Sequence, residues 1–305
     1  PLHILDSQQS RLDFLLSVSP FIGRVLQQQP ELALQLLEPT QLDWHYQDPL
    51  QQLPDSSEAN VFRALRRYRN QVLAQVLAAE LLGVKPIRRC LTEISALADG
   101  LINSAYHWAY QDLTAQWGTP MDPQGQPMPL LILGMGKLGA RELNYSSDVD
   151  LMILFDPEAM PDPDRAQSTA VRFARDLVKL MEERTEEGYV FRTDLRLRPD
   201  GAAQPLAVSI PASVSYYGSM GQNWERAAMT KARPVAGDKV LGQSFLDEIR
   251  PFVWRRHLDF AMIADIHSIK RQIHATHGHR GAGMEIAVAG HDVKLGRGGI
   301  REIEF

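Results

Sequence analysis

The segment LLILGMGKLGARELNYSSDVDLMILF, residues 130–155, constrains this chain more than any other. Its second half alternates, with Val149 and every second residue after it apolar, and strand side chains have a period of two. Asp148 and Asp150 therefore project from the same face of one strand. Carboxylates so placed lie about 6–7 Å apart at Cα and repel each other unless a cation lies between them. The pattern predicts a strand with a metal site at its start.

A glycine-rich turn precedes the two carboxylates. The apolar run from Leu130 to Leu133 ends at Gly134 and Gly136, and Lys137 follows directly. Backbone N–H groups and an ammonium can converge on an anion in such a turn. A lone Asp-x-Asp often marks no more than a turn before a buried strand. Beside a phosphate-type turn it favours Mg²⁺, which prefers one or two carboxylates together with substrate phosphates and water.

A third carboxylate is expected from a later strand, YVFRTDLRLRP, which begins at Tyr189. Strict alternation places Asp194 on one face together with Arg192, Arg196 and Arg198. Surface strands also carry arginines, but a single acid among three guanidinium groups suits a site that binds both metal and phosphate. We therefore predict Asp194 as a metal ligand and Arg196 and Arg198 as contacts of phosphate oxygens.

Composition narrows the class of protein. The 305 residues are 44% hydrophobic, which allows a sizeable core and two or three domains. A net charge of -5 argues against non-specific nucleic-acid binding. Cys90 is the single cysteine, and no secretory h-region or eighteen-residue apolar run occurs, so we expect a cytoplasmic protein without membrane segments. The start at Pro1 and the end at Phe305, within an apolar pattern, suggest a piece of a longer protein.

Helical patterns fill the chain on both sides of these strands. We expect helices over residues 62–83, 87–117 and 166–187, a linker over 118–129, and domains at 1–126, 127–205 and 206–305. Cys90, Trp108 and Trp117 are expected in the core. The arginine cluster of the first helix is expected to face solvent; it comprises Arg63, Arg66, Arg67 and Arg69.

Beyond Pro205 the pattern predicts a mainly helical region, with Trp224 in the core. Arg226 and Arg233, seven residues apart, are expected on one helix face. Two alternatives stay open for the charged set Glu225, Arg226, Lys231 and Arg233: it closes over the active site, or it forms a surface ion-pair helix. The histidines lack zinc-site spacing; they are His267, His274, His277 and His279. Glu302 and Glu304 either contribute to the metal site or begin a helix.

These features resemble the DNA polymerase β-like nucleotidyltransferase superfamily, through Gly136, Ser147, Asp148, Asp150 and Asp194. Four strings resemble the glutamine synthetase adenylyltransferase family more closely, over about residues 62–305: LGMGKLGARELNYSSDVDL, GYVFRTDLRLRPDGAAQPL, GQNWERAAMTKARPVAGD and KLGRGGIREIEF.

The resemblance implies an α+β fold: a polymerase β-like core, in which helices accompany a small mixed sheet, flanked by N-terminal and C-terminal helical regions. It also implies a two-metal Mg²⁺ site with Asp148, Asp150 and Asp194 as catalytic ligands. Gly136, Lys137 and Ser147 are then expected to bind nucleotide phosphate.

Proteins of this family contain two related halves with opposite chemistry. The Asn-Tyr-Ser-Ser before Asp148, together with GQNWERAAM, PFVWRRHLDF and KLGRGGIREIEF, resembles the adenylyl-removase half. That half implies phosphorolysis of adenylylated glutamine synthetase to ADP and unmodified enzyme, regulated through the PII signalling protein. The other half transfers AMP from ATP to a tyrosine of the synthetase. A catalytically silent regulatory half is a third alternative, although all three aspartates are present.

Overall fold

The computed structural model describes residues 7–39, 44–51, 53–117, 129–159, 163–201, 203–254, 293 and 300. The helices are α1 (Gln8–Val18), α2 (Pro20–Gln28), η2 (Pro30–Leu32), α3 (Ala33–Leu37), α4 (Glu58–Leu81), α5 (Ile87–Trp117), α6 (Gly136–Gly139), η3 (Pro157–Ala159), α7 (Pro163–Glu182), α8 (Ile210–Ser219), α9 (Asn223–Met229), α10 (Lys239–Glu248) and α11 (Arg250–Val253). The strands are β1 (Leu130–Gly134), β2 (Val149–Phe155), β3 (Thr193–Asp194), β4 (Ala207–Ser209) and β5 (Arg233–Gly237).

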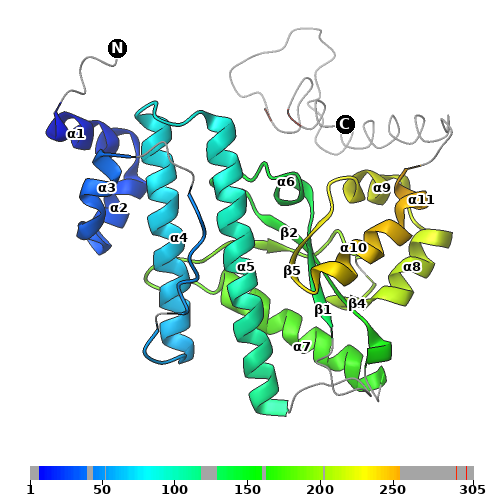
Figure 1. Cartoon of the computed structure of the whole chain (residues 1–305). Coiled ribbons are helices and arrows are strands. Elements are labelled where there is room, and N and C mark those ends of the chain that lie inside the picture. Colours follow the sequence, from blue (N-terminus) through cyan, green and yellow to red (C-terminus); the bar gives the residue numbers. More distant parts are fainter. Residues whose placement is uncertain are drawn as a thin grey trace, which may run out of the picture.

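The elements form successive layers (Figure 1). The short helices α1 to α3 lie against α4, and α4 lies beside α5. The sheet follows, with α5 and α7 on one side and the group α8 to α11 on the other. The sheet is therefore covered on both faces, as an all-apolar strand such as β1 requires.

The sheet has the order β3-β2-β1-β5, and β4 also pairs with β2. Strand β1 is antiparallel to both β2 and β5. Strands β3 and β4 run parallel to β2, β3 beside its start and β4 beside its end. The sheet is thus small and mixed, so the expected α+β fold class is confirmed.

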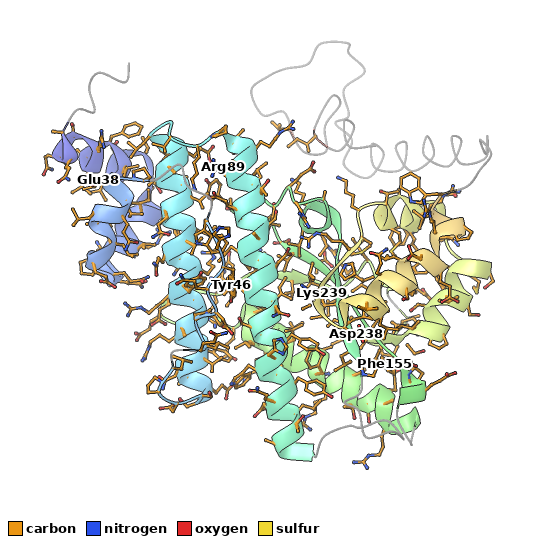
Figure 2. The ribbon with its side chains drawn as sticks, viewed as in Figure 1. Glu38, Tyr46, Arg89, Phe155, Asp238 and Lys239 are labelled. Atoms are coloured by element: carbon orange, nitrogen blue, oxygen red, sulfur yellow. The ribbon has the colours of Figure 1, made fainter. Side chains whose placement is uncertain are left out.

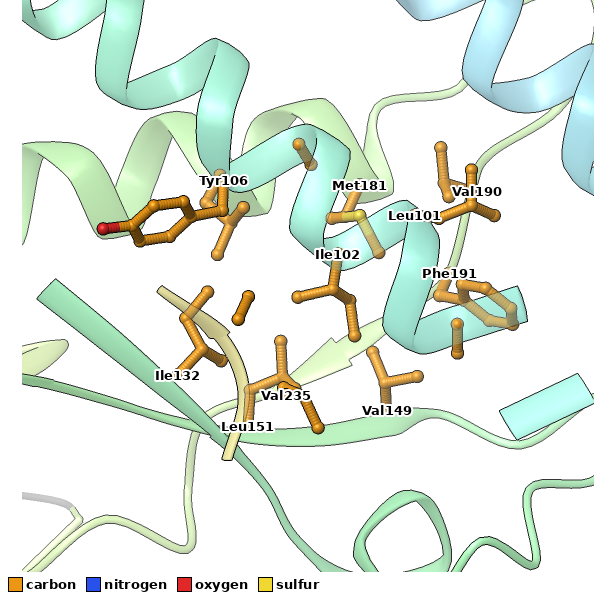
Figure 3. Close-up of a cluster of buried hydrophobic side chains, with 14 of the residues drawn as sticks. Leu101, Ile102, Tyr106, Ile132, Val149, Leu151, Met181, Val190, Phe191 and Val235 are labelled. Carbon is orange, nitrogen blue, oxygen red and sulfur yellow. The ribbon is translucent and has the colours of Figure 1, made fainter. Parts of the chain in front are cut away.

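Alternate residues of the central strands divide the core into two clusters. Val149, Leu151 and Ile132 belong to the cluster that α5 and α7 cover, which Figure 3 shows around Leu101 and Phe191. The opposite-facing residues pack with the helices α8 to α11; among them are Leu131, Leu133, Met152 and Leu154. The parity of β2 therefore places Asp150, like Met152, on the side of α8 to α11.

The two long helices agree with the predicted ranges. Helix α4 stops just before Gly83, whose φ of 71° suits a residue without a side chain. Tyr46 lies between α4 and α5 (Figure 2) and meets α5 at Gly100, where a Cβ would come within 2.2 Å of its ring. Cys90 is buried, which confirms its expected place in the core.

One expectation about these regions was wrong, and another was incomplete. Arg66 does not face solvent: it is fully buried, and its guanidinium donates hydrogen bonds to backbone carbonyls at the end of α7 and in the loop that follows. Beyond Pro205 the described residues include β4 and β5, which join the sheet, as well as the helices α8 to α11. Both strands are short and gain their hydrogen bonds from distant partners, so local periodicity does not reveal them. The domain boundaries themselves stay a prediction.

No helix in the described ranges is both long enough and apolar enough to cross a membrane.

Candidate functional site

The start of β2 places the predicted carboxylates at the edge of the sheet. The backbone oxygen of Asp150 accepts a hydrogen bond from the Met135 N–H at 2.8 Å, which ties the strand to the glycine-rich turn. Asp150 is partly buried, whereas Asp148, just before the strand, has a side chain that is 49% exposed. The pair thus lies where a buried strand emerges to solvent.

Strand β3 brings the third carboxylate to the same edge. In the parallel pairing of β2 with β3, Asp150 lies directly opposite Asp194. Residues opposite each other on neighbouring strands point to the same face and lie about 5 Å apart. The expected proximity of these two aspartates is therefore a feature of the fold.

Gly136 lies against the carboxylate of Asp150. Its φ is 52°, and a Cβ built on it would come within 2.5 Å of Asp150 Oδ2. Both the backbone conformation and the space favour glycine there. The turn is thus fitted closely around one carboxylate of the site.

Two arginines pair with the other two carboxylates. Arg192 donates through Nε to Asp148 and through Nη2 to the Ser146 carbonyl at 2.8 Å. Arg196 donates through Nε to both oxygens of Asp194, at 3.0 and 2.9 Å. These hydrogen bonds to Arg196 hold the pKa of Asp194 below its usual range, so this carboxylate is ionised at neutral pH.

The carboxylates fit a hard cation in chemistry, although their side chains do not all converge. Within the described residues, no three Asp, Glu, His or Cys side chains lie close enough together to hold one metal ion. Asp148 and Asp194 pair instead with arginines. An all-oxygen donor set on one sheet edge, with a glycine turn fitted against Asp150, nevertheless suits Mg²⁺ better than a softer metal.

A cavity of about 670 Å³ opens beside these residues. Asp148 and Asp194 line it together with Glu182 and Tyr189. Four arginines also line it: Arg184, Arg192, Arg196 and Arg198. Guanidinium groups bind phosphate oxygens in a planar, two-pronged geometry, so the cavity is suited to phosphate groups.

The predicted strand does not continue beyond Asp194, so its alternation does not place the two arginines that follow. The strand ends at that residue, and the following turn lets Arg196 fold back onto Asp194. Arg198 is buried, and it donates to the Leu195 carbonyl at 2.6 Å and to the Gln204 carbonyl at 2.9 Å. Its guanidinium thus braces the turn while it lines the cavity.

The remaining predicted phosphate contacts lie near β2. Lys137 belongs to the one-turn helix α6, directly after Gly136, and is partly buried. Ser147 is partly buried too, and its N–H donates to the Asn144 carbonyl at 3.1 Å. Lys137 is thus next to Gly136 in the chain, and Ser147 is next to Asp148.

Sequence reasoning did not assign Arg192 or Arg184 to the site. Arg192 shares its predicted face with Asp194, and that parity was the available signal. Arg184 was expected in the helix over residues 166–187, but α7 ends at Glu182, so Arg184 follows the helix.

The region after α8 corrects several expectations. Arg233 does not share a helix with Arg226: it begins β5, and its guanidinium pairs with Asp99 at 2.8 Å. Trp224 is 40% exposed, so it does not pack in the core. Glu225 and Arg226 are both buried, which is contrary to a surface ion-pair helix. The alternative that this set closes over the active site stays a prediction. The four histidines of residues 267–279 and the pair Glu302 and Glu304 lie outside the described residues.

Comparison with known proteins places this geometry in a family. The family model described as glutamate-ammonia ligase adenylyltransferase matches residues 9–248. The chain is 52% identical over 250 residues to a protein of Agrobacterium fabrum and 48% identical over 254 residues to one of Mesorhizobium japonicum. It is 40% identical over 314 residues to a protein of Bartonella henselae. All three relatives are called bifunctional glutamine synthetase adenylyltransferase/adenylyl-removing enzyme.

These matches cover 80%, 82% and 99% of this chain for the Agrobacterium, Mesorhizobium and Bartonella proteins, respectively. They cover only 24%, 25% and 32% of those proteins, so the chain spans about a quarter to a third of their length. The family model matches most of the chain, and its match includes all three aspartates. The chain therefore belongs to the glutamate-ammonia ligase adenylyltransferase family.

Proposed function

We propose that this chain removes AMP from adenylylated glutamine synthetase by phosphorolysis. An oxygen of inorganic phosphate attacks the phosphorus of the AMP group, and the bond from phosphorus to the tyrosine oxygen breaks. The products are ADP and the synthetase tyrosine, which takes up a proton. The relatives are named for both directions of adenylyl chemistry, so the direction must be argued from this site.

The arginine-lined cavity beside Asp148 and Asp194 carries the proposal. Phosphorolysis brings two phosphate groups together, the attacking phosphate and the AMP phosphate, and both are anionic. Preorganised cations around the reacting phosphorus offset this charge. Arg184, Arg192 and Arg196 are exposed, and Arg192 and Arg196 are the two that pair with the carboxylates Asp148 and Asp194, so we assign these two to the incoming phosphate.

Asp148, Asp150 and Asp194 would hold Mg²⁺ in this reaction. When bound, the ion neutralises charge on the phosphoryl oxygens and orients the attacking and leaving oxygens. Gly136, with Lys137 and Ser147 nearby, would position the nucleotide phosphate.

The surroundings of Asp194 favour phosphorolysis over adenylyl transfer from ATP. Attack by a tyrosine hydroxyl on ATP benefits from a general base, whereas inorganic phosphate is already ionised near neutral pH. Both oxygens of Asp194 accept hydrogen bonds from Arg196, so the carboxylate is engaged as an acceptor. A carboxylate bound in this way is a weak proton acceptor.

The proposed partners are adenylylated glutamine synthetase, inorganic phosphate and adenine nucleotides, with PII as the regulator that the family resemblance implies. We place the reaction in the cytoplasm.

A two-arm assay tests the direction. The chain and Mg²⁺ are incubated with adenylylated synthetase and phosphate in one arm, and with unmodified synthetase and ATP in the other. We expect ADP and loss of AMP mass in the first arm only. Asp150→Asn should abolish the reaction, and Asp156→Asn, at the far end of the same strand, should not. Pyrophosphate with added AMP mass would show that the chain adenylylates the synthetase instead, and no reaction in either arm would indicate a regulatory half.

A further inference from the structure

A second cavity, of about 560 Å³, lies next to the catalytic cavity, and Tyr189 lines both. Residues of α2 and α4 and the segments 145–146 and 186–189 form its walls. Phe21, Val25, Leu73 and Leu77 make much of the lining apolar. A volume of this size is typical of small-molecule sites.

Arg69 gives this cavity a partly buried positive charge with few partners. Among the described residues, its guanidinium donates one hydrogen bond, from Nη1 to Asn70 Oδ1 at 2.9 Å, and pairs with no carboxylate. Its Nε is buried and finds no acceptor in that same part of the chain. The rings of Phe21, Tyr189 and Phe191 lie 5.7–5.9 Å from the guanidinium carbon. Burial lowers the pKa of Arg69 to about 10.

Arg66, one turn earlier on α4, shows what a structural arginine looks like here. Arg66 is fully buried, and its guanidinium donates to the carbonyls of Phe62, Leu180, Glu183 and Gly188. Arg69 has no such set of carbonyl acceptors within the described ranges. A guanidinium held in an apolar cavity without acceptors is unfavourable until an anion binds it.

We infer that this cavity binds a small monocarboxylate, whose carboxylate pairs with Arg69 and whose planar or apolar body lies among the surrounding rings. This inference does not depend on the reaction proposed above.

The charges around the cavity set the charge of the ligand. Arg24 and Glu186, which carry opposite charges, are exposed residues of its lining. Glu187 also lines it, engaged by Arg63 at 3.4 Å and by the Thr185 hydroxyl. Of the described residues that line the cavity, Arg69 is therefore the cation left for an anionic ligand. A dianion such as phosphate is better matched to the four arginines of the catalytic cavity.

The cavity also borders the segment that leads to the metal carboxylates. Tyr145 and Ser146 line it, and the Ser146 carbonyl accepts the hydrogen bond from Arg192, which holds Asp148. We expect a bound ligand to contact this segment.

Titration calorimetry of the 305-residue chain with benzoate tests the inference. Benzoate is a planar monocarboxylate, and benzamide is its neutral equivalent of the same shape. We expect benzoate to bind at least about tenfold more tightly than benzamide, since a charge-assisted hydrogen bond is about twice as strong as a neutral one. Arg69→Gln should weaken benzoate about tenfold or more and leave benzamide unchanged. Arg67→Gln, which removes the same charge from α4 outside the cavity, should bind benzoate like the parent chain.

Asn70→Asp provides a second variant that keeps the arginine. The new carboxylate would take the place of the ligand beside Arg69, so benzoate binding should be lost while the far-ultraviolet circular dichroism stays unchanged. Equal affinity for benzoate and benzamide, unchanged benzoate affinity in Asn70→Asp, or no benzoate binding to the parent chain at tens of millimolar would each overturn the inference.

Discussion

Substitution of Gly136 by alanine should have two effects: strain in the backbone of the turn, and displacement of the Asp150 carboxylate that lies against it. At φ 52°, an L-residue costs about 1–2 kcal/mol, so the free energy of unfolding should fall by that amount. The added Cβ would also lie 2.5 Å from Asp150 Oδ2, so the carboxylate must move. Displacement of a catalytic group by about 1 Å costs about 100-fold in rate, or about 2.7 kcal/mol of barrier.

Gly188→Ala is the matched control. Gly188 also has a positive φ, 93°, but no atom of the described residues lies within 4 Å of the point where an added Cβ would sit. Urea unfolding should show a comparable loss of stability in both variants, whereas turnover and Mn²⁺ affinity should fall in Gly136→Ala alone. A folded Gly136→Ala chain with turnover within about twofold of the parent would refute the reasoning.

The two other predictions concern buried groups. Arg66→Met leaves several buried carbonyls without their donor, so the free energy of unfolding in urea should fall by about 3 kcal/mol. The control Arg63→Met, which replaces an exposed arginine, should lower it by at most about 1 kcal/mol. Equal losses in the two variants would contradict the structural role of Arg66. The Tyr217 hydroxyl is buried without a hydrogen-bond partner among the described residues, whereas the Tyr106 hydroxyl donates to the Leu130 carbonyl. Tyr217→Phe should therefore stabilise the chain by up to about 1 kcal/mol, and Tyr106→Phe should destabilise it by a similar amount. Burial raises the pKa of Tyr217 above its usual range, so the stability that its neutral form contributes is present below about pH 10 and is lost as the pH rises further. The advantage of Tyr217→Phe in chemical unfolding should therefore grow above that pH, and a constant difference would show that the hydroxyl is solvated.

Long periodic elements were predictable from the sequence, because their pattern repeats over many residues. The ranges of α4 and α5 agree with the apolar stripe, and the alternation in β2 gave the correct face for Asp150. The resemblance added the expectation that Asp194 joins this site, and the structure places Asp194 opposite Asp150, 44 residues away in the sequence.

Features that depend on distant partners could not be predicted in this way. Strand β5 has five residues and a proline, and it exists because β1 supplies its hydrogen bonds. Alternation continues in the sequence after Asp194, but the chain turns there, so Arg196 binds its own neighbour and Arg198 binds backbone carbonyls. The burial of Arg66 likewise requires the end of α7, more than a hundred residues away.

The central claim is that Asp148, Asp150 and Asp194 form one divalent-metal site. Titration of the chain with Mn²⁺ in the presence of ADP, followed by electron paramagnetic resonance, tests it without any turnover. We predict two bound ions per chain, and loss of at least one in Asp150→Asn and in Asp194→Asn, but none in Asp156→Asn. Mn²⁺ binding by Asp150→Asn and Asp194→Asn with the stoichiometry and affinity of the parent chain would contradict the account.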